Sequence, residues 1–315
     1  MKKYLLSAIA VIAAGAFTSC NQNGFGLENI NPYSREKVNF SSNITKVNLP
    51  TTRAGGVKWD TNDAIGIFMF EKSSTNIVEE KSNIEYFTLS EGITGAFEPK
   101  GNDTIFFPDN GDEVRFMSYY PYTADITDYV YGIDVSNQAS QSAIDLLYSF
   151  AYTDSYNKTV PGKKVPLVFD HKLTKININV RPEEGLNSND LKDLIVTFEG
   201  FYTKAEFDLL TGDISEHSEI KSITPLKIEE IADYDFSYES IVLPMTDPST
   251  ASLKFDLNNK GEQNSDVFTW NFKANGELKS GFEYTYNVTV NRSGIVVEAK
   301  INKWSNGGSE NIIAE

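Results

Sequence analysis

The sequence contains few histidine and cysteine side chains that could serve as general bases, nucleophiles or metal ligands. Histidine occurs only at His171 and His217, and cysteine only at Cys20. Zinc sites are built from clusters of cysteine and histidine, so this small and scattered set predicts no metal centre. His171 follows Phe169 by two residues on the same side of a predicted strand, where a structural histidine is the expected role.

Carboxylate and phosphate chemistry are not indicated either. With 44 acidic residues, some carboxylates lie close together by chance, and a retaining glycosidase needs a pair ~5 Å apart in a cleft. "DTND" (60–63) and "DNGD" (109–112) lack the distal glutamate of a calcium loop and are typical of turns. There is no Gly-x-Ser-x-Gly elbow, and "PGKKVP" (161–166) lacks the glycine spacing of a phosphate loop. We therefore predict that the chain is not an enzyme and takes no cofactor.

The single cysteine follows a segment that is typical of an export signal. Lys2 and Lys3 precede an apolar run from Leu5 to Phe17, which is too short to span a membrane. The sequence "FTSC" (17–20) resembles the bacterial lipobox, in which the cysteine receives a diacylglyceryl group and becomes the first residue after cleavage. Lipidation of Cys20 would explain an unpaired cysteine. An ordinary signal peptide followed by a free thiol is the alternative.

The negative charge of the mature chain limits the classes of molecule that it can bind. Removing residues 1–19, with their two lysines, takes the formal net charge from −16 to −18 and leaves 296 of the 315 residues. Nucleic acids are bound through clustered lysine and arginine, so we predict no nucleic-acid partner. Anionic headgroups are equally poor partners, and attachment to the outer membrane would come from the acyl chains on Cys20.

The elements that must position any site are predicted to be strands. Aromatic and β-branched residues, interrupted by turn residues, form runs of strand length throughout the mature chain, such as "AIGIFMF" (64–70), "EVRFMSYYPY" (113–122), "SLKFDL" (252–257) and "FEYTYNVTV" (282–290). Helical signal is limited to 141–150 and to 187–194, where Asn187 or Ser188 is a suitable cap. The predicted fold class is all-β, with few short helices.

A change of phase divides the mature chain. In "VPLVFDHKLTKININV" (165–180), apolar residues occupy odd positions up to Leu173 and even positions from Ile176. Successive strand residues face opposite sides, so the second set faces the other way, through a bulge or a passage into another sheet. We expect two tandem β-sandwiches, residues 55–169 and 170–304, after an N-terminal segment (20–54) and before a tail (305–315).

One stretch carries a resemblance to a known family. In "TTRAGGVKWDTNDAIGIFMF" (51–70), Trp59, Asp63, Ile65 and Gly66 form a motif that resembles the opening of fimbrillin-like proteins, the type V pilins of gut and oral anaerobes. Further matching segments follow in the family's order and cover nearly the whole mature chain: "GAFEP" (95–99), "VRFMSYYPY" (114–122), "FDLLTGDI" (207–214), "IVLP" (241–244) and "INKW" (301–304).

The resemblance implies a function and a processing site. Members are outer-membrane lipoproteins with two transthyretin-like sandwiches, and they build or anchor a fimbria that contributes to cell adhesion. In polymerising members a trypsin-like protease cuts after an arginine and releases the first strand, and a strand from another fimbrial subunit takes its place. Arg53, before Ala54, is at the expected position. "EKVNFSSNIT" (36–45), with Val38, Phe40 and Ile44 on one face, is the expected removable strand.

Several alternatives stay open at this point. Arg53 could lie in a linker that is not cut, and shaft, tip and anchor subunits are not separated by these motifs. A surface lipoprotein that binds glycans is the competing function. The tyrosines of "SYYPY" (118–122) and "DYVYG" (128–132) would then stack on sugar rings. No adhesion ligand on a host or bacterial surface is indicated.

Overall fold

The computed structural model describes residues 35–44, 58–151, 154–159, 162, 164–183, 185–257, 267–272, 276–291, 294–304 and 309–310. Within these residues the regular structure is β-strand apart from 3-10 structure at η1 (Ser188–Leu191) and at Phe272. The predicted all-β fold class is therefore confirmed. Among the same residues, no helix is long and apolar enough to cross a membrane.

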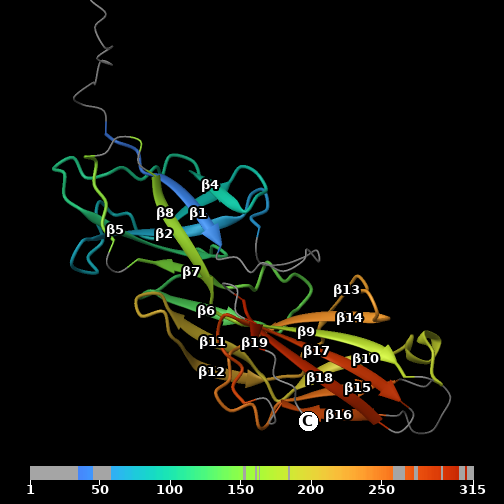
Figure 1. Cartoon of the computed structure of the whole chain (residues 1–315). Helices are drawn as coiled ribbons and strands as arrows, with labels where there is room; N and C mark the ends of the chain where they lie inside the picture. The colour runs from blue at the N-terminus through green and yellow to red at the C-terminus, as the bar shows by residue number, and fades with distance from the viewer. Residues whose placement is uncertain are drawn as a thin grey trace, which may run out of the picture. The chain divides into compact units, whose positions relative to one another are not determined.

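The strands of the described residues form one closed barrel and three open sheets (Figure 1). The barrel contains, in order, β1 (Asn39–Ile44), β4 (Thr94–Pro99), β3 (Ile84–Thr88), β2 (Ala64–Glu71), β5 (Val114–Tyr120), β7 (Leu147–Phe150) and β8 (Lys164–His171). A three-stranded sheet contains β12 (Ile214–Ile220), β11 (Tyr202–Asp208) and β6 (Val130–Asp134).

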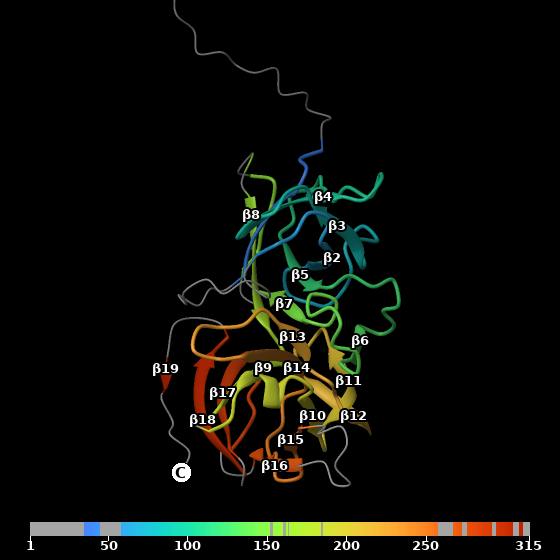
Figure 2. The ribbon, with the colours of Figure 1, turned by 90° about the vertical axis from the view of Figure 1, so that its right-hand side faces the viewer.

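Side chains from two further sheets form a common apolar core, and Figure 2 shows the strands of both sheets. The larger contains β13 (Leu226–Ile228), β14 (Phe236–Val242), β9 (Thr174–Pro182), β17 (Phe282–Asn291), β18 (Gly294–Lys303) and β19 (Ser309–Glu310). The smaller contains β10 (Ile195–Glu199), β15 (Ser252–Asp256) and β16 (Val267–Asn271). The core residues alternate along these strands, as Ile176, Ile178 and Val180 do in β9.

Strand β2 is apolar at nearly every position because both of its faces are covered. Ile65, Ile67 and Met69 belong to the core inside the barrel. Phe68 and Phe70 belong to a second core outside it, which they share with residues of β6 and β11. A continuous apolar run is the pattern expected of a strand that is buried on both faces.

The change of phase near residue 170 coincides with a passage from one sheet to another. Val165, Leu167 and Phe169 of β8 point into the barrel core, whereas Ile176, Ile178 and Val180 of β9 point into the core of the six-stranded sheet. The chain from Arg35 onward packs as one compact unit. The division into domains at 55–169 and 170–304 stays a prediction.

The expected short helices are largely replaced by other structure. At 187–194 the chain forms the 3-10 turn η1, and Asn187 is its N-cap: the Asn187 side chain accepts a hydrogen bond from the Asn189 amide at 2.9 Å. The expectation of helix over 141–150 is wrong for its last four residues, which form β7. Leu147 packs inside the barrel and Tyr148 outside it, so pairing with β5 and β8 outweighs local helical preference.

Candidate functional site: the position of strand β1

Strand β1 closes the barrel by joining two strands that are far apart in the sequence. It pairs antiparallel with β4, where Ser42 lies opposite Gly95, and parallel with β8, where Asn39–Ile44 lie opposite Lys164–Phe169 (Figure 1). In the described part of the chain, no other strand connects β4 with β8. If β1 left, the facing edges of β4 and β8 would have unpaired N–H and C=O groups, which accept a new strand readily. We call this position between β4 and β8 the β1 site.

The inward side chains of β1 and of the residue before it are fully buried. Val38, Phe40, Ser42 and Ile44 are exposed by 0%, 3%, 1% and 2%. The Phe40 ring lies edge-on to the rings of Tyr86 and Phe116, at centroid distances of 5.3 and 5.0 Å. The structure thus places Val38, Phe40 and Ile44, the residues of the predicted removable strand, on one face in the barrel core.

Contacts at the start of β1 are polar and lie at the surface. The Lys37 ammonium lies 2.6 Å from the Glu98 carboxylate. Arg35 forms an ion pair with Glu79, and the Gly162 amide donates to Glu36 Oε1 at 3.0 Å. Exposed ion pairs contribute about 0–1 kcal/mol each. Burial of apolar side chains and backbone pairing therefore hold β1 in place.

The motif residues Trp59 and Asp63 lie at the side of the same barrel. The buried Trp59 ring is edge-on to Phe97 and Phe169, each at 5.2 Å. Asp63 accepts hydrogen bonds from the Asp60 amide at 2.7 Å and from the Tyr120 hydroxyl at 3.1 Å. Burial raises the pKa of Asp63 above its usual value, and these two hydrogen bonds oppose the shift only in part. Both residues support the barrel wall and do not form a reactive site.

The other two motif residues have packing roles. Ile65 is fully buried in the barrel core. Gly66 faces the Tyr119 ring so closely that a Cβ on Gly66 would lie 2.3 Å from it, and 2.6 Å from Asn83 Oδ1. The Tyr119 hydroxyl donates to Asn83 Oδ1 at 2.7 Å. Glycine is needed here because the ring occupies the space of a side chain.

The predicted lipidation and processing residues are not placed by the structure. Cys20, Arg53 and Ala54 lie outside the described residues, so lipidation and cleavage stay predictions. The described part of the N-terminal segment ends with Ile44, the last residue of β1, and the next described residue of the chain is Lys58.

The two histidines do not meet. His171 is buried, its Nδ1 lies 2.9 Å from Asp145 Oδ1, and its ring stacks on Trp304 at 3.8 Å. His217 is exposed and lies beside Tyr202, with 5.7 Å between the ring centroids. The described residues contain no group of three or more His, Cys, Asp or Glu side chains that could hold a metal ion. His171 is structural, and sequence reasoning missed its partners because Trp304 is more than a hundred residues away in the chain.

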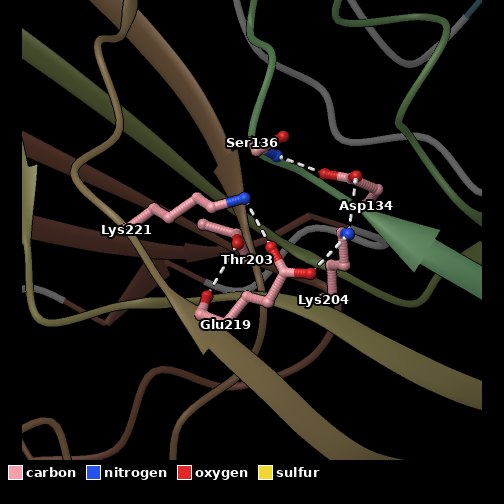
Figure 3. Close-up of polar contacts among 6 residues, drawn as sticks. All are labelled: Asp134, Ser136, Thr203, Lys204, Glu219 and Lys221. Carbon is pink, nitrogen blue, oxygen red and sulfur yellow. Dashed lines mark hydrogen bonds and ion pairs between the residues drawn. The ribbon is translucent and has the colours of Figure 1, made fainter.

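The exposed edge of β12 is charged and irregular, whereas the β1 site is apolar and regular. The Glu219 carboxylate binds the ammonium groups of Lys204, at 2.6 Å, and Lys221, while Lys204 also lies 4.0 Å from Asp134 (Figure 3). These hydrogen bonds, first that of Lys204, lower the pKa of Glu219 to about 2, so the carboxylate is ionised at neutral pH. Glu216 and Glu219 have φ values of 52° and 55°, which interrupt the extended backbone. Charge and irregular backbone oppose the addition of a strand at this edge.

Of the tyrosines considered for glycan stacking, two are buried, and Tyr122, Tyr129 and Tyr131 are half-buried against the core outside the barrel. Tyr119 and Tyr120 are 0% and 7% exposed. The Tyr131 ring lies edge-on to Tyr119 at 5.4 Å, and the Tyr129 ring lies 5.6 Å from Phe68. The buried rings of Tyr119 and Tyr120 offer no exposed face to a sugar, and the half-buried rings pack against apolar neighbours, so no observation favours the glycan-binding alternative.

Comparison with known proteins identifies the family. Residues 52–304 match the model of the fimbrillin-like proteins. The chain belongs to the fimbrillin-like family. Members of this family are structural fimbrial proteins, so the predicted absence of enzymatic function is confirmed.

Individual relatives agree with this membership. A protein assigned as a fimbrium subunit, Fim1C, from Bacteroides uniformis is 30% identical over 324 residues and is matched along 100% of both chains. A crystal structure assigned to a cell adhesion protein of Bacteroides uniformis has a TM-score of 0.69 at 27% identity, over 85% of this chain and 98% of that one. A similar structure from Bacteroides ovatus has a TM-score of 0.63 at 20% identity, over 87% and 100% of the two chains, and supports the fold alone.

Proposed function

We propose that this fimbrillin-like chain is a subunit of a cell-surface fimbria and that it joins its neighbour by strand exchange at the β1 site. Cleavage after Arg53 separates β1 from the rest of the chain, β1 leaves, and a strand from another fimbrial subunit takes its place. The observation that supports this proposal is that β1 alone, among the described strands, joins β4 to β8. The Bacteroides uniformis relative assigned as a fimbrium subunit supports the same assignment.

The burial of β1 gives the joint its strength. Full burial of an apolar side chain contributes about 1.5–3 kcal/mol, so Val38, Phe40 and Ile44 together contribute about 5–9 kcal/mol before the cost of ordering the strand. An incoming strand with similar side chains would recover this free energy and the backbone pairing of both neighbours. Head-to-tail joints of this kind extend into filaments because they do not close on themselves.

Cleavage is the step that makes the exchange possible. An attached β1 returns to its site as an intramolecular event, at an effective concentration in the millimolar range. A separated β1 is diluted into the surroundings and competes poorly with the strand of a docked neighbour. Export with lipid on Cys20 would hold the precursor at the outer membrane until the protease acts, and subunits that keep the lipid would serve as anchors.

N-terminal sequencing of protein recovered from the cell surface tests this proposal. The wild-type protein should begin at Ala54 and should form ladders of high molecular mass on mild electrophoresis. Arg53→Ala should keep lipidated Cys20 and lose the ladders, whereas Lys46→Ala, in the same segment, should behave as the wild type. Ladders of wild-type intensity from Arg53→Ala would remove cleavage at Arg53 from the mechanism.

A further inference from the structure

One inward position of β1 is small, although its neighbours on the same face are large. Val38, Phe40 and Ile44 are apolar, and Ser42 lies between the last two in the alternation. Ser42 is 1% exposed, so its size is not explained by contact with solvent. The residue opposite Ser42 on β4 is Gly95.

The space around Ser42 is limited by the residues of β4. A Cβ on Gly95 would lie 2.7 Å from Ser42 Oγ and 2.9 Å from the Phe97 ring. The φ value of Gly95 is not positive, so space and not backbone conformation requires glycine. The Gly95 amide donates a hydrogen bond to Ser42 Oγ at 3.3 Å. Ser42 and Phe97 together fill the room that the missing side chain leaves.

The wall of this space cannot move easily. Phe97 is 4% exposed, and its ring is edge-on to Trp59, which is also edge-on to Tyr120 and Phe169. Extra methylene groups at residue 42 would have to displace this set of packed rings. Close-packed interiors resist such insertion.

We propose that Gly95 and Phe97 select by size the strand that occupies the β1 site, and this inference rests on the proposed function. The occupant is an extended segment of a partner subunit, parallel to β8, whose successive inward residues are aliphatic, aromatic, small (Gly, Ala or Ser) and aliphatic. A shift by two residues would bring an aromatic or large aliphatic side chain onto Gly95. The small position therefore fixes the register of the joint.

Residues 305–315 of a second copy do not meet this requirement. The sequence "SNGGSENIIAE" has no aromatic residue, and aligning Ile313 with Ile44 puts Asn311 at the small position and Ser309 at the aromatic one. Aligning Ile312 instead puts Glu310 at the small position. In the structure, Ser309–Glu310 form β19, which pairs with β18 of the same chain. The strand that fits the β1 site therefore comes from a segment other than residues 305–315.

Variants of the full chain test the size limit directly by hydrogen exchange in β4 and β8. Ser42→Leu should raise amide exchange there at least tenfold, because the larger side chain displaces β1. Ser42→Ala and the outward-facing Ser41→Leu should stay within about threefold of the wild type. Wild-type protection in Ser42→Leu would overturn the inference. Should Ser42→Leu fail to fold, Gly95→Ala tests the same space from the other side, with Gly132→Ala as its control, and unchanged protection would again overturn it.

Labelled peptides test the occupant. The peptide 36–45 should bind to the full-length Ser42→Leu chain, and the same peptide with Ser42→Leu, as well as the peptide 305–315, should bind at least tenfold more weakly. Equal binding of the leucine peptide would overturn the size limit. These measurements do not need cleavage at Arg53. Suppose that the wild-type peptide binds more tightly than the leucine peptide and that Arg53→Ala cells still form ladders. The size limit would then stand, and only cleavage at Arg53 would be removed from the mechanism.

Discussion

Replacing Phe40 with alanine should lower the free energy of unfolding of the full chain by about 3–5 kcal/mol, the usual cost of removing a buried phenylalanine side chain. Phe40 is 3% exposed, and its ring has edge-on contacts with both Tyr86 and Phe116. The matched control is Asn39→Ala. Asn39 precedes Phe40 on the same strand and is exposed, so its replacement should change stability by less than about 0.5 kcal/mol.

Two measurements separate a loss of the whole fold from a local loss of β1. Urea denaturation followed by tryptophan fluorescence reports on the whole fold, because Trp59 belongs to the same cluster as Phe40, while Trp270 and Trp304 pack in the two other clusters. Hydrogen exchange in β4 and β8 reports on the opening of the β1 site. If β1 can leave by itself, amides of β4 and β8 should show an opening free energy below the global free energy of unfolding, since exchange detects partial opening. Phe40→Ala should lower both free energies by a similar amount, because Phe40 loses its contacts in either opening.

The result that would refute this reasoning is also defined. If Phe40→Ala costs less than about 1 kcal/mol and leaves exchange in β4 and β8 unchanged, β1 is not a structural part of the barrel. Strand exchange at the β1 site would then have no energetic basis.

Two further predictions concern the motif residues of the barrel. Gly66→Ala should destabilise the protein by about 1–3 kcal/mol, because the new methyl group meets the Tyr119 ring. Gly132→Ala should not destabilise it, because nothing lies within 4 Å of the added Cβ. Thermal denaturation of both variants measures the difference. Asp63→Asn should change the pH dependence of stability. Burial raises the folded-state pKa of Asp63 above 3.8, so the folded state binds more protons, and this carboxyl lowers stability as pH rises through that pKa. The free energy of unfolding at pH 6 minus that at pH 3.5 should therefore be more positive for Asp63→Asn than for the wild type, and equal differences would contradict the raised pKa of Asp63.

Several features of the fold could be predicted from local patterns. The apolar runs of β2 and β5 indicate strands buried on both faces, and the alternation along residues 165–180 indicates the point where β8 ends and β9 begins in another sheet. The sequence offers Asn187 or Ser188 as a cap, because a short side-chain oxygen satisfies the first free amides of a helical turn, and in the structure Asn187 is the cap. Each of these signals depends on residues within about one element of each other.

The candidate site could be predicted only in part. The alternation of Val38, Phe40 and Ile44 indicates a strand with one buried face, and the family motifs point to residues 36–45 as that strand. Neither indicates which strands flank it. The partners of β1 are Thr94–Ala96 on β4 and Lys164–Phe169 on β8, and the residues of β8 follow β1 by more than a hundred residues in the chain. Periodicity states which face is buried and contains no information on pairing at that distance.

The amino-acid sequence by itself determined the all-β class, strands such as β2, β5, β15 and β17, the acidic charge and the family, because local propensity, side-chain alternation and charge act over a few residues. Only the tertiary structure decided that β1 closes a barrel, that His171 stacks on Trp304, and that Ser42 must be small. These depend on which distant residues share one packed core, and close packing makes each of them sensitive to atoms that no local pattern contains.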